Sequence, residues 1–480
     1  MNYRMICRVL GQILLIYAEL LFLPLIAGLF CGESVLPFVN TIVPTAVLGG
    51  LLLLPKPQSR SVVARDSFVI VGLGWILISL LGALPFVFSG SIPSYIDALF
   101  ETASGLSTTG ASVLQDFDAM PRGVMFWRCF THWIGGMGVL VFLMAVLPMS
   151  GEHGMHIMRA EVPGPTVGKL VPRLKHTARI LYLIYIGLTL LEMIALLCAG
   201  LSFYDALLHS FSTAGTGGFS TMPDSVAGFH STAVENIIAV FMVLFGLNFN
   251  LYYLLLLGQF GKVIRNEECR AFLLHILIAT GLIALGLRLQ CGEETRRAVH
   301  DAFFNVASIL STTGFGTEDF TRWPEYCKWI LILLMLCGGC AGSTGGGIKL
   351  SRLMILFRSA KCDLRGMSRP RNVFRVELEG KRVEPSTVRA SLTFVTFYAM
   401  LMFLIAALLS LDGIDIATGF TAAISCLSNI GPGMTTVIGP AGSFAFFSAP
   451  AKILLTVAML MGRLEFYPIL VLFSPRTWKR

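Results

Sequence analysis

Apolar residues along this chain gather in long stretches of about twenty residues, the length that crosses a bilayer as a helix. Shorter polar segments separate these stretches. Ten stretches have this character: 9–30, 36–54, 68–89, 124–148, 180–200, 236–258, 271–289, 328–357, 391–410 and 450–473. The pattern predicts an all-α polytopic membrane protein.

Basic residues concentrate in alternate connections, at 55–66, 149–179, 259–270 and 352–389. The last of these has ten Lys and Arg, from Arg352 to Arg389, against four acidic residues. Because cytoplasmic loops carry an excess of Lys and Arg, the alternation predicts that both termini face the cytoplasm. The basic loop 352–389 reflects this rule, forms a docking surface for a regulatory partner, or does both.

The connections on the opposite side contain apolar runs of about twelve residues, too short to cross a bilayer. These runs predict re-entrant helices at Tyr95–Leu106, Phe203–Thr213, Val299–Leu310 and Ile416–Leu427. A glycine-centred string follows each run: Thr108-Thr109-Gly110, Thr216-Gly217-Gly218, Thr312-Thr313-Gly314 and Asn429-Ile430-Gly431.

The unit of span, short helix, glycine string and span therefore occurs four times, which sets the architecture. We expect the repeats at 61–160, 161–262, 263–375 and 376–480, pseudo-symmetric around one central pore. Two further N-terminal spans, in residues 1–60, stand outside them.

Four glycine strings around one axis suit a selectivity filter. Backbone carbonyls can replace the water that a dehydrated cation has lost. Glycine adopts the backbone angles that aim successive carbonyls at one axis, angles that are costly for residues with a Cβ. One such string by itself reads as a turn near a helix end. Four strings at matched positions favour the filter, with the residues of all four strings as predicted cation ligands.

Composition narrows the class further. The chain is 55% hydrophobic and only 13% charged, with a mean hydropathy of +0.76, whereas a soluble chain is about one-quarter charged. The eleven cysteines include several within apolar runs and read as small buried residues. We find no nucleophile–base pair, zinc signature or dinucleotide fingerprint. The sequence therefore predicts no enzyme activity, no catalytic residues and no bound organic cofactor.

Further strings carry a resemblance to a known family: Trp133 to Gly138, Arg159 to Pro165, Asn248 to Asn250, Gly338 to Lys349 and Gly462 to Glu465. With the four repeats, they resemble the TrkH/KtrB/HKT superfamily, and most of all its bacterial TrkH branch. The resemblance covers nearly the whole chain. It implies potassium uptake across the bacterial cytoplasmic (inner) membrane, with K+ as the transported ion. It also implies a homodimer and a soluble nucleotide-binding regulatory subunit of the TrkA kind.

The resemblance also bears on selectivity, because family members with glycine at all four filter positions are generally potassium-selective. Gly110, Gly218, Gly314 and Gly431 meet that condition. The register of the second string depends on Phe219 matching Phe315, and a shift to Gly215 or Gly217 stays open.

A glycine-rich string interrupts the span 328–357, which is longer than one crossing needs and poor in helix propensity there. Its candidate gate residues are Gly338, Gly339, Gly342, Ser343, Thr344, Gly345, Gly346 and Gly347. We hypothesise that this loop obstructs the ion path on the cytoplasmic side of the filter. Close helix packing through small residues is the alternative.

Charged residues within or beside the spans supply further candidates. Arg463 is expected to contact the glycine-rich loop and repel cations, or else to pair with Glu465. Glu19 is expected to be buried, with a packing or partner role.

Four outer acidic residues, Asp97, Glu101, Asp116 and Asp118, concentrate cations or form a solvated loop. His153 and His156 are expected in a solvated cytoplasmic loop. The driving force stays open, and a sodium- or proton-coupled symporter is the alternative to a gated pore.

Overall fold

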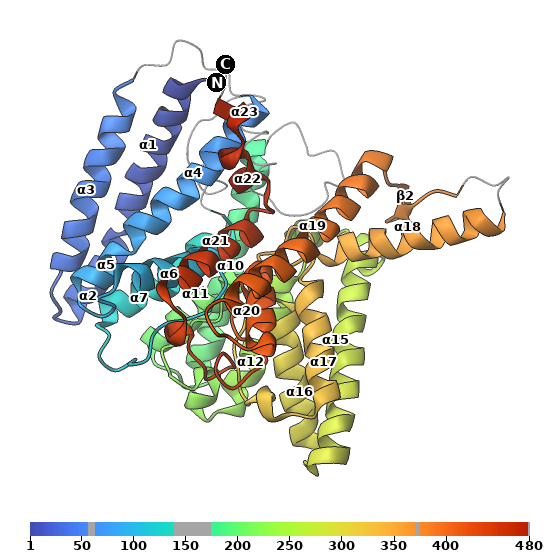
Figure 1. The fold of residues 1–480 in the computed structure, drawn as a ribbon. Helices are drawn as coiled ribbons and strands as arrows, with labels where there is room; N and C mark the ends of the chain where they lie inside the picture. The colour runs from blue at the N-terminus through green and yellow to red at the C-terminus, as the bar shows by residue number, and fades with distance from the viewer. Residues whose placement is uncertain (56–62, 139–173, 370–373, 479–480) are drawn as a thin grey trace.

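The computed structural model describes residues 1–55, 63–138, 174–369 and 374–478 (Figure 1). The regular structure of these residues is almost entirely helical; within them a single antiparallel hairpin pairs β1 (Glu377–Leu378) with β2 (Lys381–Arg382). The two ends of the chain lie together at one end of the molecule, where the Tyr3 hydroxyl donates to the Trp478 carbonyl at 3.3 Å.

Two N-terminal spans stand beside the rest of the chain, as predicted. The first consists of α1 (Tyr3–Leu20) and α2 (Phe22–Phe30), and the second is α3 (Leu36–Leu53). α1 and α3 pack closely at two glycines: a Cβ at Gly11 would lie 2.7 Å from the Gly49 carbonyl oxygen. Small residues permit such backbone approach between membrane helices.

Each repeat begins with a long apolar helix on the outside of the molecule. These helices are α4 (Ala64–Gly82) continued by α5 (Leu84–Phe88), α10 (Leu174–Cys198), α15 (Glu267–Gly286) ending in a π-helical turn (Leu287–Cys291), and α19 (Pro385–Ser410). Leu183, Leu277 and Met400 on them are 62%, 70% and 63% exposed. So much exposed apolar surface suits lipid rather than water.

The four predicted re-entrant helices are present with nearly the predicted bounds. They are α6 (Tyr95–Leu106), α11 (Phe203–Gly215), α16 (Thr295–Leu310) and α20 (Ile416–Ser428). Ser94, Ser202 and Asp415 cap three of them by accepting a backbone N–H in the first turn. At 12 to 16 residues, these helices are too short to cross a bilayer.

The second helix of each repeat ends partway along the span. In the first repeat this helix is α7 (Arg122–Gly136). In the others a second helix follows the break: α12 (Thr232–Gly246) with α13 (Phe249–Leu256), α17 (Glu325–Cys337) with α18 (Leu350–Ser368), and α21 (Ala449–Arg463) with α22 (Tyr467–Phe473). Shorter elements complete the chain: η1 (Ser225–Phe229), α14 (Phe260–Ile264), η3 (Phe320–Arg322), η4 (Phe444–Phe446) and α23 (Pro475–Trp478).

The sequence predicts the interruption in the third repeat and misses those in the second and fourth. α12 and α13 meet at 90°, because Leu247 is extended and the Asn248 side chain caps the new helix at the Asn250 N–H. α21 stops where Glu465 and Phe466 take positive φ. The described residues thus contain six helices, or continuous helix pairs, long and apolar enough to cross a membrane, and one bent pair.

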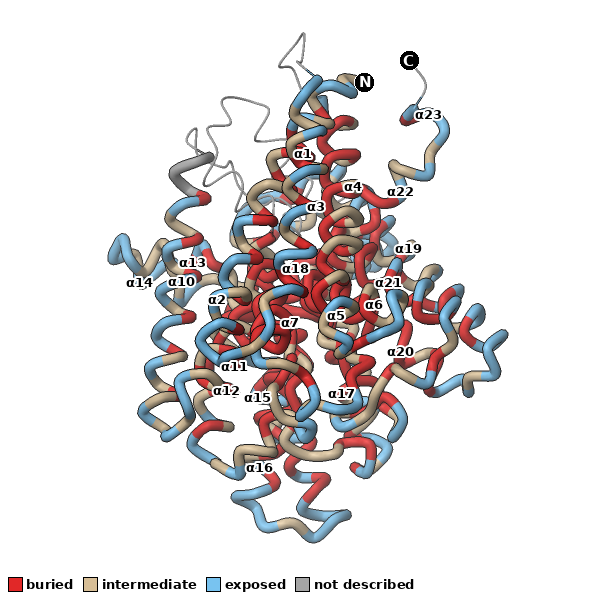
Figure 2. Tube along the Cα trace, turned by 90° about the vertical axis from the view of Figure 1, so that its left-hand side faces the viewer, coloured by how far each residue is buried: buried red, intermediate tan, exposed pale blue. Residues whose placement is uncertain are grey.

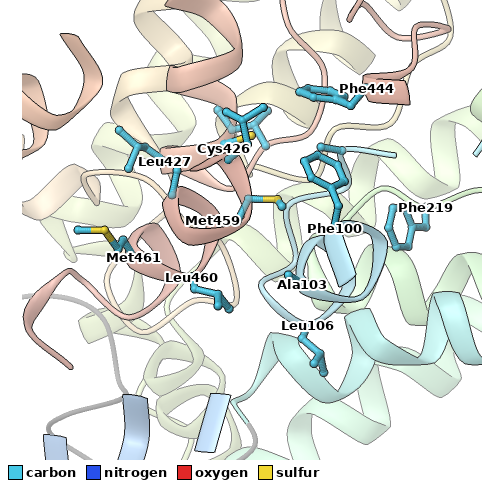
Figure 3. Close-up of a cluster of buried hydrophobic side chains, with 14 of the residues drawn as sticks. Phe100, Ala103, Leu106, Phe219, Cys426, Leu427, Phe444, Met459, Leu460 and Met461 are labelled. Atoms are coloured by element: carbon cyan, nitrogen blue, oxygen red, sulfur yellow. The ribbon is translucent and has the colours of Figure 1, made fainter. Parts of the chain in front are cut away.

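The repeats close into a ring. The second helix of each repeat contacts the re-entrant helix of the next: α7 with α11, α12 with α16, α17 with α20, and α21 with α6. Buried residues accumulate at the centre of this ring (Figure 2). Figure 3 shows the closing contact between the fourth and first repeats, where Met459 and Leu460 lie near Ala103 and Leu106.

Candidate functional site

Four glycine segments follow the re-entrant helices: residues 108–112, 216–220, 312–316 and 429–433. Their first residues are left-handed, with φ of 57° at Thr108, 55° at Thr216, 61° at Thr312 and 55° at Asn429. The next N–H in each segment donates back to a serine carbonyl inside the helix, at Ser104, Ser212, Ser308 and Ser425, over 2.8–3.0 Å. This is a Schellman-type helix end, repeated four times.

The glycine two positions later is also left-handed in every segment. Its φ is 82° at Gly110, 79° at Gly218, 86° at Gly314 and 105° at Gly431. In backbone conformation, Gly218 is therefore the counterpart of the other three. Gly215 ends α11 instead, and Gly217 lies one residue before the left-handed position.

The four glycines stand edge to edge with the neighbouring segments. A Cβ at Gly110 would overlap the carbonyl oxygen of Gly217, and one at Gly218 would overlap that of Thr313. The same holds for Gly314 against Ile430, and Gly431 approaches the carbonyl of Thr109. The order 1, 2, 3, 4 and back to 1 closes a ring of backbone.

This ring has the chemistry of a cation site. Carbonyl dipoles from four segments and the C-terminal ends of four helices meet in one place, and both favour positive charge. A cavity of about 270 Å³ opens onto the ring, lined among others by the four glycines. The structure thus brings together the twelve predicted ligand residues of the four strings.

The glycine-rich loop (residues 338–349) packs against the opposite side of the ring. The Gly346 N–H donates to the Thr312 hydroxyl at 2.7 Å, and a Cβ at Gly346 would overlap the Ser428 carbonyl. The loop also reaches the break in the second repeat, where the Cys340 N–H donates to the Gly246 carbonyl at 3.0 Å. Glycine here is a steric requirement of the contact.

Arg463 joins the loop to the first repeat. Its guanidinium donates to the carbonyls of Thr344 at 2.7 Å, Gly135 at 2.5 Å and Gly136 at 2.6 Å. The predicted contact with the glycine-rich loop is therefore present. Glu465, the alternative partner from the sequence, accepts two hydrogen bonds from Arg352.

Lys349 is a second buried cation of the loop, and sequence reasoning gave it no role. Its ammonium donates to the Gly345 carbonyl at 2.6 Å and lies 3.5 Å from both the Cys340 carbonyl and the Ser343 hydroxyl. The sequence signal that could have identified this residue is a lysine placed two residues after the last glycine of an apolar string. The loop thus surrounds one buried basic side chain and contacts a second, Arg463.

Two of the four outer acidic residues, Glu101 and Asp97, form ion pairs instead of the expected cation-attracting or solvated loop, whereas Asp116 and Asp118 lie in an exposed turn. Glu101 is fully buried and pairs with Arg128 at 2.7 Å, while Asp97 pairs with Lys452 at 2.6 Å. Asp116 accepts the N–H groups of Asp118 and Ala119 within its own exposed turn. Glu101 is therefore no free cation attractor, because a neighbouring cation neutralises it.

Other sequence expectations have mixed outcomes. Glu19 is exposed on α1 rather than buried, because it lies on the face of α1 that turns away from the other helices. The string Arg159 to Pro165, His153, His156 and the end of the predicted span 124–148 lie outside the described residues.

Comparison with known proteins places this architecture in a family. The family profile described as TrkH, cation transport protein, matches residues 36–480. The chain is 36% identical over 487 residues to the Trk system potassium uptake protein TrkH of Salmonella typhimurium, with full coverage of both chains.

A second relative, the Trk system potassium uptake protein TrkG of Escherichia coli, is 34% identical; the alignment covers 100% of this chain and 99% of TrkG. The crystal structure of the potassium transporter TrkH from Vibrio parahaemolyticus superimposes with a TM-score of 0.90 at 32% identity, over 100% of both chains. The chain therefore belongs to the TrkH family of cation transport proteins, which are multi-pass membrane transporters and not enzymes.

Proposed function

We propose that this protein takes up potassium through the ring of glycine segments. The observation that carries the proposal is the closed contact of Gly110, Gly218, Gly314 and Gly431, each against a carbonyl of the next segment. Four segments in one backbone conformation present equivalent carbonyls, which a dehydrated cation requires. Relatives of similar length are named as potassium uptake proteins.

The glycine-rich loop is the proposed gate. It lies against the ring at Thr312 and Ser428, and Arg463 fastens it to the first repeat. The buried Arg463 guanidinium at this position opposes the passage of another cation, and Lys349 adds to this repulsion when it is protonated. Opening then requires the loop to leave the ring and the Arg463 hydrogen bonds to break.

The setting of the transporter completes the proposal. We place it in the bacterial inner membrane, with both termini and the basic segment 352–389 on the cytoplasmic side. A homodimer and a nucleotide-binding subunit of the TrkA kind, acting on the gate from that side, are part of the proposal.

The experiment that tests the pore is cation flux into liposomes containing the purified protein under an imposed voltage. Potassium, rubidium, sodium and lithium are compared for wild type, Gly314→Ser and the control Gly281→Ser. A Cβ at Gly281 would meet no atom within 4 Å, so the control should behave as wild type. Flux that favours potassium and rubidium, with selectivity lost only in Gly314→Ser, supports the proposal. Equal flux of all four ions in wild type contradicts it.

If wild type shows no flux, the assay is repeated with the soluble partner added. A closed gate predicts that the partner with its nucleotide restores selective flux.

A coupled symporter is the second candidate, favoured by one buried carboxylate. Glu192 in α10 is fully buried, and coupled transport uses such groups to carry or exchange the driving ion. Potassium flux that requires a sodium or proton gradient, and loses that requirement in Glu192→Gln, would select this mechanism. Potassium flux driven by voltage alone would instead support the pore.

A further inference from the structure

A buried cluster of polar side chains lies on the outer side of the ring, between the first two glycine segments. Its centre is Arg128 on α7, whose side chain is 2% exposed. Arg128 donates to the Glu101 carboxylate at 2.7 Å, to the Ser112 hydroxyl at 3.1 Å and to the Ser220 carbonyl at 3.0 Å. One guanidinium therefore contacts both segments, at the positions two residues after Gly110 and Gly218.

Glu101 extends the cluster along the first segment. One carboxylate oxygen accepts the Ser112 hydroxyl at 2.8 Å, and the other accepts the Val113 N–H at 2.8 Å. The carboxylate is thus surrounded by donors from the segment and from Arg128. A buried ion pair is stable when hydrogen bonds satisfy its remaining atoms, and this pair meets that condition.

His209 extends the cluster along the second segment. Its Nδ1 lies 2.9 Å from the Asp205 carbonyl, which can only accept, so Nδ1 carries the proton. Its Nε2 then accepts the Ser220 hydroxyl at 3.0 Å. The Arg128 guanidinium also stacks on the Phe219 ring, 3.7 Å from its centroid. Segment 2 is therefore held from its re-entrant helix and from α7.

The other two repeats lack this arrangement. Glu101 and His209 both stand nine residues before the filter glycine, where the third and fourth repeats have Asn305 and Ala422. Asn305 donates to the hydroxyl of Thr317, one residue beyond its segment, at 3.5 Å. Ala422 has no polar side chain. Charge-assisted hydrogen bonds, which are the strong ones, thus hold segments 1 and 2. Neutral hydroxyl donors hold segments 3 and 4 instead: Ser308 donates to the Phe315 carbonyl and Ser425 to the Gly431 carbonyl, both at 2.6 Å.

We propose that Arg128, Glu101 and His209 are positioning residues that set the discrimination between potassium and sodium. The proposal rests on the proposed function of the ring. The cluster fixes the outer halves of two segments and hence the distance between their carbonyls and the axis. Arg128 and Glu101 together are neutral, so the cluster imposes this spacing without repelling the entering cation. When it is removed, the two segments can close around a smaller ion.

The test is the potassium-to-sodium flux ratio in liposomes for the charge-free variant Glu101→Gln/Arg128→Met. We expect the ratio to fall by about tenfold, as expected for lost charge-assisted hydrogen bonds at the segments. The matched control is Asp97→Asn/Lys452→Met. Asp97 lies one turn before Glu101 on the same helix, and its ion pair with Lys452 contacts no glycine segment. The control should retain the wild-type ratio.

A folded Glu101→Gln/Arg128→Met protein with the wild-type ratio overturns the proposal. If that variant does not fold, variants of His209 provide the test. His209→Leu should lower the potassium-to-sodium ratio, whereas His209→Gln, which retains an acceptor for Ser220, should keep the wild-type ratio. An unchanged ratio in His209→Leu also overturns the proposal. Failure of the underlying function looks different, because wild type itself would then show no preference for potassium.

Discussion

At the scale of single residues, two separate constraints act on each of the four glycines of the proposed filter. The backbone is left-handed, with φ between 79° and 105°, where a Cβ is costly. The Cα also faces a carbonyl of the next segment with no space for a methyl group. A side chain at one of these glycines therefore disturbs its own segment and displaces a carbonyl of its neighbour.

Gly218 is the position where this double constraint is most informative, because the sequence leaves the second register open. We predict that Gly218→Ala abolishes the preference for potassium over sodium in liposome flux. Gly187→Ala is the control, since a Cβ at Gly187 would meet no atom within 4 Å. A selective Gly218→Ala protein would show that another glycine of this string occupies the filter position.

Arg463 holds the glycine-rich loop, the proposed gate, against the first repeat through hydrogen bonds to three carbonyls. Each charge-assisted bond contributes about 1.5–3 kcal/mol, so its loss should favour the open loop. We predict that Arg463→Ala raises potassium flux without the regulatory partner by about tenfold or more.

The control for this variant is Lys452→Met, on the same helix and paired with Asp97 away from the gate. Unchanged flux in Arg463→Ala would refute the role of Arg463 in closure.

The sequence predicts these glycines and Arg463 because local signals mark them. A repeated string marks the glycines, and a charge within an apolar span marks the arginine. It gives a wrong role to Glu101, because its partner Arg128 lies 27 residues away along the chain. Only the packing of α6 on α7 brings the two together, and no periodicity in the sequence encodes that contact.

At the scale of elements, the glycine-rich loop acts through close backbone contact. A Cβ at Gly346 would overlap the Ser428 carbonyl, and one at Gly345 would lie 2.8 Å from the Ser311 carbonyl. The loop can therefore lie against the ring only while these positions have no side chain. The glycine content of the loop is therefore required for its close packing against the ring.

We predict that Gly346→Ala weakens this fit and raises potassium flux in the absence of the partner. Flux measured in liposomes should rise toward that of Arg463→Ala, because both changes release the same loop. Gly366→Ala in α18, where a Cβ would meet nothing within 4 Å, should leave the flux as in wild type. If Gly346→Ala shows the same flux as wild type and Gly366→Ala, the close contact of the loop has no role in gating.

The elements also show where sequence reasoning fails. The re-entrant helices are predictable, because each is a short apolar run before a glycine string. The breaks after Gly246 and Arg463 are not, because the few polar residues there, such as Asn248 and Glu465, do not by themselves distinguish a broken span from a continuous one. Tertiary contacts accompany both helix ends: the Phe249 N–H donates to the Gly342 carbonyl at 3.1 Å, and Phe466 stacks on Phe394 with ring centroids 4.9 Å apart.

At the scale of the whole molecule, a bound cation would connect four parts of the chain that are far apart in sequence. The ring joins residues near 110, 218, 314 and 431. A ligand that binds only the folded ring stabilises the fold by mass action. The ion is then both cargo and a tertiary contact.

We therefore predict that the purified protein melts at a higher temperature in potassium or rubidium than in sodium or lithium at equal ionic strength. At a potassium concentration one hundred times the dissociation constant, the gain would be about 2.7 kcal/mol. Gly110→Ser should remove the difference between ions. An identical melting temperature for wild type in all four salts would argue against an ion-binding ring.

The contact between Gly431 and Thr109 has a consequence for the synthesis of the protein. The ring is completed only when the last repeat, made last by the ribosome, packs on the first. A partly synthesised chain in the membrane contains three of the four glycine segments, so its ring is incomplete. Because Arg463 lies on α21, the helix that follows the fourth segment, the residue proposed to hold the gate closed is made together with the last side of the ring. We therefore expect that nascent chains do not dissipate the membrane potential of the cell that makes them.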